Sequence, residues 1–544
     1  MTIAATAGEN VRSGGMTAEE RKVIFASSLG TVFEWYDFYI YGTLGPSLAK
    51  FFFANVPANL ALIFTLLAFA AGFAVRPFGA LIFGRLGDLI GRKYTFLITM
   101  TLMGMGTFFI GLLPGYATWG LAAPIVLIAL RLVQGLALGG EYGGAATYVA
   151  EHAPNSKRGY YTSWIQTTAT LGLFMALLLI LTIQRSMGDE SFTSWGWRIP
   201  FLASGILLAV SIWIRLTLNE SPVFQRMKDE GKTSKRPLTE AFGEWRHAKL
   251  AILALFGATA GEAVVWYGGQ FYALLFLTQT LKVPSSTAWI LILISLGLGT
   301  PFFVLFGWLS DKIGRKPIIL AGFLLAAVTY FPIFKGITHF ANPKLEAALA
   351  SAPVTVIADP SECSFQFKAT GTEKFTSGCD IAKAGLVNLS VNYTSEEAPK
   401  GTPAQVKIGD QTLSPTSPDF AKALPAAIAK HGYPASADPN DINFPMTTVL
   451  LWILVIYVTL VYAPIAAWLV ELFPSRIRYS GMSLPYHIGN GWFGGFLPAL
   501  AFAFATWTGN IYSGLWYPIA IATMSLVVGF LFLPETKDVD ITKT

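Results

Sequence analysis

The feature that most constrains this chain is a series of long apolar runs separated by short polar segments. Of its 544 residues, 53% are hydrophobic and only 13% are charged, and the mean hydropathy is +0.53. A soluble domain usually carries about 25% charged residues. Only helices and closed barrels satisfy their backbone hydrogen bonds in lipid, and runs of about 20 residues or more are too long for strands. Twelve transmembrane helices are therefore predicted, at residues 23–50, 58–84, 94–114, 119–150, 160–184, 199–218, 249–280, 286–308, 317–340, 446–473, 480–507 and 511–533.

One polar segment occurs twice in the chain. Gly84–Lys93 and Gly307–Lys316 both read Gly-x-x-x-Asp-x-x-Gly-Arg-Lys, and each joins the end of one apolar run to the start of the next. One membrane unit is thus repeated. A doubled helical bundle with a site between the halves is how many secondary transporters are built.

The repeat and the apolar runs predict the organisation of the whole chain. We expect an all-α membrane protein with two pseudo-symmetric six-helix halves, residues 1–218 and 249–544, joined by a polar linker at 219–248. Residues 341–445 interrupt the second half with a polar stretch rich in Pro, Ser, Thr and Ala. This stretch predicts an insertion between the ninth and tenth helices.

The distribution of basic residues predicts the orientation in the membrane. Lys and Arg cluster in short segments on one side of the predicted helices, whereas the loops near 51–57, 114–118 and 507–511 have neither. Cytoplasmic loops carry this excess, so both termini are expected in the cytoplasm and the insertion outside it. The same clustering argues against nucleic-acid binding, despite the net charge of +6. Residues 1–20 are polar and small, so no cleavable signal peptide is expected.

The insertion is expected to form a small, partly ordered domain. Val354–Val356, Leu386–Val391 and Ala404–Ile408 are predicted as short strands. In an oxidising compartment, Cys363 and Cys379 favour a disulfide that contributes about 3 kcal/mol, with two free thiols as the alternative. Two cysteines cannot supply a four-ligand zinc site, and we expect no metal and no cofactor.

Four further motifs, together with the doubled loop, resemble one transporter family. They are Glu34-Trp-Tyr-Asp-Phe-Tyr-Ile-Tyr-Gly42, Arg76-Pro-Phe-Gly79, Arg131-Leu-Val-Gln-Gly135 and Gly139-Gly-Glu-Tyr-Gly-Gly144. The chain resembles the metabolite:H⁺ symporters of the major facilitator superfamily, a group that includes transporters of proline and betaine, α-ketoglutarate, citrate and shikimate. The resemblance covers everything except the insertion. The first loop departs from the pattern, with Leu89 where the superfamily usually has a basic residue.

Charged residues inside the predicted helices are the main functional candidates, because a charge in the bilayer needs a partner or a water-filled path. Glu34 and Asp37 share a helix face, and two carboxylates so close in low dielectric should not both ionise easily. This suits a proton carrier. The resemblance implies that Asp37 and Arg131 form the coupling pair, so we expect Asp37, Arg131 and Glu34 to carry proton coupling. Fixed ion pairs that lock the bundle are the alternative.

The remaining candidates divide into substrate-binding and gating residues. Substrate binding is expected at Arg76, Glu141, Tyr41, Gln166, Glu262, Trp266, Tyr267, Gln270 and Asn490, which combine charged, amide and aromatic side chains along the predicted helices. His487 is a weaker candidate, since a lone His in a bundle is more often structural. The repeated loops supply the gating candidates Asp88, Arg92, Asp311 and Arg315, and the resemblance implies that these loops stabilise an outward-facing state.

The most specific function that these patterns favour is a proton-coupled symporter that imports a small carboxylate-bearing metabolite. Its expected partners are the substrate, protons and the lipid bilayer, and the expected oligomeric state is a monomer. A proline or betaine osmolyte symporter, a drug/H⁺ efflux antiporter and a membrane sensor with a ligand-binding insertion remain as alternatives. An enzyme is not expected, because the chain has no Walker loop, no His-Glu-x-x-His and no serine elbow. The expected location is a bacterial inner membrane.

Overall fold

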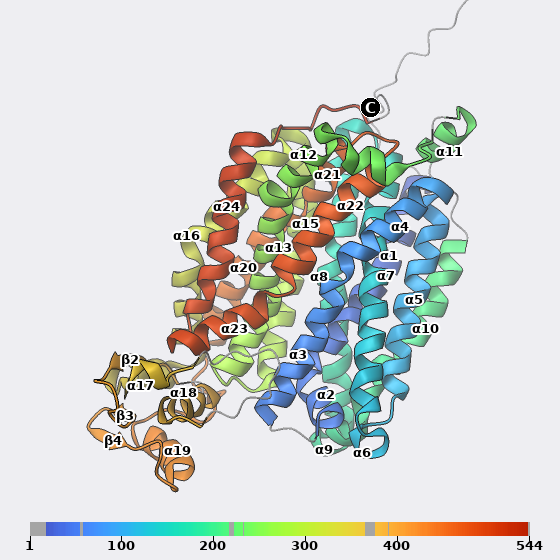
Figure 1. Cartoon of the computed structure of the whole chain (residues 1–544). Coiled ribbons are helices and arrows are strands. Elements are labelled where there is room, and N and C mark those ends of the chain that lie inside the picture. Colours follow the sequence, from blue (N-terminus) through green and yellow to red (C-terminus); the bar gives the residue numbers. More distant parts are fainter. Residues whose placement is uncertain are drawn as a thin grey trace, which may run out of the picture.

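Long helices make up most of the molecule, as the apolar runs predict (Figure 1). The computed structural model describes residues 18–54, 58–216, 222–231, 233–364, 376–389 and 391–541. The first group of helices is called the N-terminal bundle. It contains α1 (Ala18–Thr43), α2 (Gly45–Phe52), α3 (Ala58–Ala74), α4 (Arg76–Ile90), α5 (Arg92–Leu112), α6 (Tyr116–Trp119), α7 (Ala122–His152), α8 (Arg158–Met187), α9 (Asp189–Ser191) and α10 (Arg198–Leu216).

The second group, the C-terminal bundle, packs against the first mainly through its helices α15 and α22. Helix α15 lies along α8, and α22 lies along α4 and α7. Short π-helical segments interrupt the helices of this bundle, among them η5 (Tyr267–Tyr272) and η8 (Gly489–Gly494). The C-terminal bundle contains α12 (Trp245–Ala254), α13 (Ala260–Trp266), α14 (Ala273–Leu275), α15 (Ser285–Ile313), α16 (Arg315–Ala341), α20 (Phe444–Tyr462), α21 (Ile465–Leu472), α22 (Arg478–Ile488), α23 (Leu497–Thr508) and α24 (Trp516–Phe532).

The number of membrane-length helices falls short of the predicted twelve. Ten helices in the described part of the chain are long and apolar enough to span a bilayer, or eleven if Asp189–Gly196 and Arg198–Ile214, which meet at a bend of 57°, form one span. The predicted first span, 23–50, corresponds to α1 and α2. Helix α1 runs through the same bundle (Figure 1), but Glu34 and Asp37 lower its hydropathy.

The two repeated loops adopt the same backbone conformation. Gly91 has φ 118° and ψ 157°, and Gly314 has φ 112° and ψ 158°. L-residues with a side chain rarely adopt such a positive φ, so glycine at these two positions allows α4 and α15 to stop and the next helix to start at once. We call the end of the molecule with these loops, α11 (Pro222–Asp229) and the C-terminal segment the loop end (Figure 1).

The insertion forms a small α/β domain at the opposite end, which we call the insertion end (Figure 1). Its four-stranded sheet has the order β2-β1-β3-β4, with β1 parallel to β2 and antiparallel to β3. Its elements are α17 (Pro343–Ser351), β1 (Val354–Ala358), α18 (Gly378–Asn388), β2 (Thr394–Glu397), β3 (Gln405–Ile408), β4 (Gln411–Leu413) and α19 (Phe420–Lys430).

Two of the three predicted strands are present in this domain, and one prediction was wrong. Val354–Val356 lies in β1, and β3 covers all but the first residue of Ala404–Ile408, but the first half of Leu386–Val391 belongs to α18. The Ser377 hydroxyl accepts a hydrogen bond from the Asp380 backbone N–H and thereby caps α18. A short apolar run cannot be distinguished from a buried helical segment by periodicity alone.

The insertion is held to the C-terminal bundle at two places. The structure joins Cys363 and Cys379 in a disulfide. The Tyr393 backbone N–H donates to the Gly509 carbonyl at 2.8 Å, and the Ala437 N–H donates to the Lys282 carbonyl at 3.0 Å. Gly509 has φ 73° and lies so close to Tyr393 that a side chain would not fit. These contacts fix the insertion on the C-terminal bundle.

Candidate functional site

Arg76 lies where the second apolar run is broken in the middle of the bundle. Pro77 follows it and lacks an N–H, so the helix breaks at Val75 and α4 starts anew at Arg76. The side chain is completely buried. Its Nη2 lies 3.3 Å from Nδ1 of His487 on α22, a helix of the other bundle. Arg76 therefore lies at the junction of the two bundles.

Glu262 is the buried acid on the C-terminal side of this junction. Its Oε2 accepts a hydrogen bond from the Asn490 side-chain amide at 2.9 Å. Asn490 lies in η8, and Tyr267, five residues after Glu262, opens η5. Such π-helical segments are rare and are frequent at functional sites. The charge of Arg76 lies close enough to act on Glu262.

Aromatic rings from both bundles surround these charges. The Tyr142 and Tyr486 rings stack across the junction with centroids 3.5 Å apart, and the Tyr486 hydroxyl lies 2.9 Å from that of Tyr462. Trp266 stacks on both Trp35 and Tyr39 of α1. The predicted Trp266 and Tyr267 thus lie in a shared aromatic shell.

Two predicted substrate-binding amides tie the bundles together. Gln166 donates from Nε2 to the Tyr142 hydroxyl at 3.0 Å and to the Tyr462 carbonyl at 2.7 Å. Gln270 donates to the Thr170 hydroxyl at 3.0 Å. Part of their hydrogen-bonding capacity is thus used by the protein.

Many buried polar atoms around this junction have no hydrogen-bond partner within the described residues. They are Nε and Nη1 of Arg76, Oε1 of Glu262, Nε2 of His487, Oε1 of Gln166, Nε1 of Trp266 and the hydroxyls of Tyr39 and Tyr267. Burying a polar group without a partner is costly, and native proteins have few such groups. Their concentration beside an Arg and a Glu is typical of a site for a polar ligand.

Asp37 and Arg131, the predicted coupling pair, lie in a second buried cluster. Within the described residues no ion pair joins them. Arg131 Nη1 donates to Oε1 of Gln134 at 2.8 Å, and Nε2 of Gln134 donates to the Thr107 hydroxyl at 2.6 Å. Thr107 in turn lies beside the Asp37 carboxyl. Two neutral side chains that were not among the predicted site residues therefore lie between the predicted pair.

Aromatic rings take the place of a carboxylate around Arg131. Its guanidinium carbon lies 4.2 Å from the centre of the Tyr41 ring and 5.3 Å from the centres of the Phe38 and Phe69 rings. Cation–π contacts of this kind are worth about 2 kcal/mol or more when desolvated. Tyr41, predicted to bind substrate, thus belongs to the Arg131 cluster. Glu34 is buried on the same helix as Asp37, and the Glu141 side chain lies outside the described residues.

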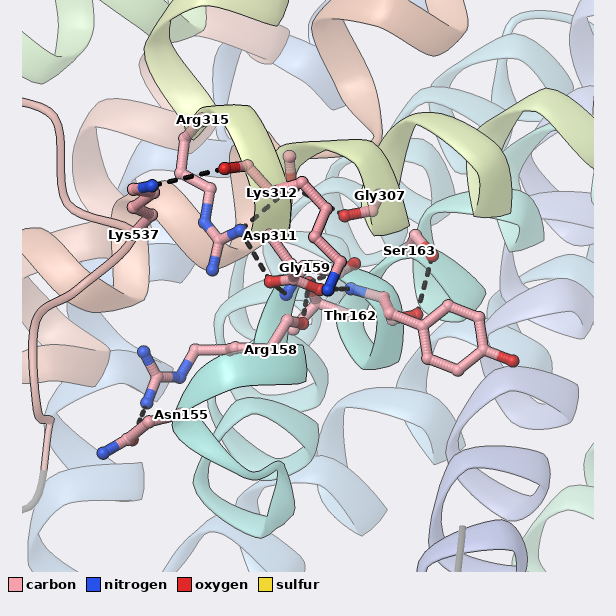
Figure 2. A network of polar contacts seen from close by, with 12 residues as sticks. Asn155, Arg158, Gly159, Thr162, Ser163, Gly307, Asp311, Lys312, Arg315 and Lys537 are labelled. Atoms are coloured by element: carbon pink, nitrogen blue, oxygen red, sulfur yellow. Dashed lines mark hydrogen bonds and ion pairs between the residues drawn. The ribbon is translucent and has the colours of Figure 1, made fainter. Parts of the chain in front are cut away.

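At the loop end, the repeated aspartates cap helices of the opposite bundle. Asp88 of α4 accepts from the Ser480 N–H at 3.1 Å and the Ser480 hydroxyl at 2.7 Å, at the start of α22. Asp311 of α15 accepts from the Gly159 and Tyr160 N–H groups at 2.8 Å each, at the start of α8 (Figure 2). A carboxylate at a helix N-terminus is favourable because it binds free N–H groups and opposes the helix dipole. The Arg92 side chain lies outside the described residues.

Two buried ion pairs beside these caps were not predicted from the sequence. Arg158 Nη1 lies 2.7 Å from Oε1 of Glu471, and Arg478 Nη1 lies 3.1 Å from Oε1 of Glu151. Each pair joins one bundle to the other. The signal was present in the sequence. Six residues separate Glu151 from Arg158, and six also separate Glu471 from Arg478, with a Pro three positions after each Glu. A second internal repeat therefore marks the second set of contacts between the bundles.

The gating candidate Arg315 extends this network within the C-terminal bundle. It lies 2.6 Å from Asp311 and 3.0 Å from Glu471. The C-terminal segment closes over the same place, since the Val539 carbonyl accepts from Arg158 at 3.3 Å and the Ile541 carbonyl accepts from Arg478 at 3.0 Å. Figure 2 shows Arg158, Asp311 and Arg315 gathered around the start of α8.

Towards the insertion end, aromatic rings of the two bundles pack together. The Phe69 and Phe271 rings stack with centroids 5.4 Å apart, and Gly42 lies against Phe271. Nε1 of Trp492 donates to the Ala74 carbonyl at 3.2 Å. The structure thus holds the loop end closed with buried ion pairs and the other side with ring packing.

Comparisons with known proteins agree with this architecture. Residues 22–256 and 425–544 match the family model described as sugar (and other) transporter. The chain is 36% identical over 317 residues to the shikimate transporter of Escherichia coli strain K12, and this match covers 58% of this chain and 72% of the relative. It is 34% identical over 349 residues to the alpha-ketoglutarate permease of the same strain, covering 64% and 78%. Identity to the proline/betaine transporter of Salmonella typhimurium is 35% over 327 residues, with 58% of this chain and 64% of that relative covered.

Among solved structures, the fold is similar to a proton:xylose symporter of the major facilitator superfamily. The TM-score is 0.61 at 16% identity, and the match covers 96% of this chain and 98% of the symporter. At this identity the likeness concerns the fold.

Proposed function

Because this chain belongs to the sugar (and other) transporter family and is a multi-pass metabolite transporter of the major facilitator superfamily, we propose that it is a proton-coupled symporter that imports a small carboxylate-bearing metabolite. The observation that carries the proposal is the buried guanidinium of Arg76, whose Nε and Nη1 have no partner in the described structure. Charge-assisted hydrogen bonds from a guanidinium to a carboxylate are among the strong ones in proteins. Shikimate, α-ketoglutarate, proline and betaine, named for the relatives, all bear a carboxylate.

The proposed membrane arrangement has twelve spans in two six-helix halves, 1–218 and 249–544, with α1 and α2 as the first span. The basic residues of the linker and of the repeated loops support a cytoplasmic loop end, with both termini on that side. The insertion is then extracytoplasmic, where its disulfide is chemically favoured. With the loop end in the cytoplasm, the ion pairs that close it correspond to a state closed towards the cytoplasm. The proposed location is a bacterial inner membrane, and the proposed oligomeric state is a monomer.

Asp37 is the proposed proton carrier, with Glu34 beside it, and Arg131 acts on it through Gln134 and Thr107. The Thr107 hydroxyl accepts from Gln134 at 2.6 Å and lies 3.1 Å from the Met103 carbonyl. When Asp37 is ionised, this hydroxyl can turn its proton to the carboxylate, and when Asp37 is protonated it can return to the carbonyl. The charge of Arg131 is thereby felt at Asp37 without direct contact.

A zwitterionic osmolyte is the second candidate substrate. Glu262 has one oxygen without a partner in the described structure, and the Trp266, Tyr39 and Tyr462 rings lie near it. An anion with aromatic rings suits an ammonium group. Arg76 and Glu262 would then bind the two ends of one molecule.

Uptake by the purified protein in liposomes with an imposed pH gradient tests the proposal. We expect accumulation of at least one compound among shikimate, α-ketoglutarate, proline and betaine when the interior is alkaline, and its loss when the gradient is dissipated. Arg76→Gln should abolish uptake of every carboxylate. Glu262→Gln should affect a zwitterion far more than an organic acid. Accumulation that needs an acidic interior would instead indicate efflux.

A further inference from the structure

His487 is a buried residue of the central junction whose role the transport proposal leaves open. It is fully buried in the last turn of α22, directly before η8. One ring nitrogen, Nδ1, lies 3.3 Å from Arg76 Nη2. The other, Nε2, has no hydrogen-bond partner in the described part of the chain.

The contact with Arg76 fixes the protonation of the ring. A guanidinium has five N–H donors and no acceptor, so it donates and Nδ1 must accept. Nδ1 therefore has its lone pair towards Arg76, and the ring proton of a neutral imidazole lies on Nε2. Within the described residues no carboxylate forms an ion pair with His487, so a second positive charge on this ring, beside Arg76, would have no direct counter-ion. The ring is thus neutral and offers an N–H from Nε2.

The free N–H belongs to a group of donors without protein acceptors. Arg76 Nε and Nη1, the Tyr267 hydroxyl and Trp266 Nε1 share this condition. Tyr267 lies close enough to Arg76 to feel its charge. Buried donors are rarely left without an acceptor, so a group of them calls for an acceptor that the protein does not supply.

We propose that His487 is a specificity-determining residue that donates from Nε2 to a substrate oxygen next to the carboxylate oxygens bound by Arg76. The proposal rests on the proposed transport of a carboxylate-bearing metabolite. Arg76 supplies charge, whereas His487 supplies one directed neutral donor. A site built to hydrogen-bond an oxygen rejects analogues that lack it, because the donor is then left unpaired. His487 thus makes the site read an oxygen at a defined position as well as a negative charge.

Two substitutions separate this role from that of holding Arg76. In His487→Asn, the shorter amide places an oxygen near the position of Nδ1 and keeps an acceptor for Arg76, but loses the distant donor. In His487→Gln, the longer amide places an N–H near the position of Nε2. Binding of shikimate, α-ketoglutarate, proline and betaine to the full-length purified protein is measured by calorimetry, with the melting temperature of the unliganded variants as the folding control.

We expect that His487→Asn weakens binding of the transported compound by about 10-fold or more, and that His487→Gln stays within about 3-fold of the parent protein. The reverse order overturns the proposal and leaves His487 as a positioning residue for Arg76. Equal losses, or no loss in either variant, overturn it as well. If the parent protein binds none of the four compounds, the proposed transport function itself fails. If the parent and both variants bind a compound equally, only the proposed role of His487 fails.

Discussion

Replacing Glu471 with Gln is expected to open the loop end without unfolding either bundle. Glu471 bonds to Arg315 at 3.0 Å and to the Thr536 hydroxyl at 2.6 Å, both within its own bundle, but to Arg158 at 2.7 Å across the junction. Only the contact with Arg158 must break when the bundles separate. The substitution therefore acts mainly on the equilibrium between closed and open states.

The size of the effect follows from the burial of this pair. Both side chains are completely shielded from solvent. Removing one partner of a buried ion pair costs about 3–5 kcal/mol. The lower value applies here, because Arg158 keeps its contacts with Asn155 and the Val539 carbonyl. At about 1.4 kcal/mol per factor of ten, the closed state should lose about 100-fold in relative population.

Spin labels at Ser156 and Lys312 would measure this shift. These residues are exposed at the loop end, one in each bundle, and the two native cysteines are bridged to each other. The distance between the two spin labels, measured by pulsed electron paramagnetic resonance, should be longer in Glu471→Gln than in the parent protein. Glu535→Gln is the matched control, because Glu535 accepts from Arg315 and Lys316 of its own bundle. Unchanged distances in Glu471→Gln, or equal lengthening in the control, would refute the reasoning. A double-mutant cycle with Arg158→Ala isolates the pair.

Three further predictions concern other parts of the molecule. Thr107→Val should abolish pH-driven accumulation while leaving counterflow intact, because the link to Asp37 is lost although every charge remains; normal accumulation would argue against the relay. Asp88→Asn should lower transport velocity and keep substrate affinity within a few-fold, since the carboxylate acts between the bundles far from Arg76; a normal velocity would reduce the loop to a topology signal. The hydrogen bonds from His431 to the Ala427 carbonyl and to Asp410 raise the pKa of this imidazole above its usual value. Because its pKa is raised by folding, protonated His431 stabilises the insertion at low pH, and this stabilisation is lost as the pH rises through that pKa. Thermal unfolding of the insertion should therefore occur at a slightly higher temperature at about pH 6 than at about pH 8, and His431→Gln should remove the difference.

The sequence predicted those features that depend on local composition. Apolar runs predicted the helices because their length leaves no other way to satisfy the backbone. The repeated loop marked Asp88 and Asp311 as candidates, and both lie at contacts between the bundles. Contacts between bundles were harder to predict. Glu151 and Glu471 lie at helix ends, where charged residues are usually solvated, so their burial depends on the packing of the opposite bundle.

The central site shows the same limit. Arg76 and Glu262 were expected as candidates because charges in a membrane helix are costly. That Thr107 and Gln134 would lie between Arg131 and Asp37 could not be predicted, since a Thr and a Gln cost little anywhere in a helix and Thr107 lies on a different helix from Gln134. Side-chain pairing across a bundle is decided by helix rotation, which periodicity leaves undetermined.

The crossed pairing of Glu151 with Arg478 and Glu471 with Arg158 has the form of an isologous interface. In such an interface, residue i of one unit contacts residue j of the other while j contacts i, as a two-fold axis requires. A single six-helix unit with one Glu and one Arg at this spacing would form both bridges by pairing with a second copy of itself. The loop end of this one chain therefore has the contact pattern of a symmetric dimer. A substitution in only one of the two Glu–Arg segments makes the two ion pairs unequal.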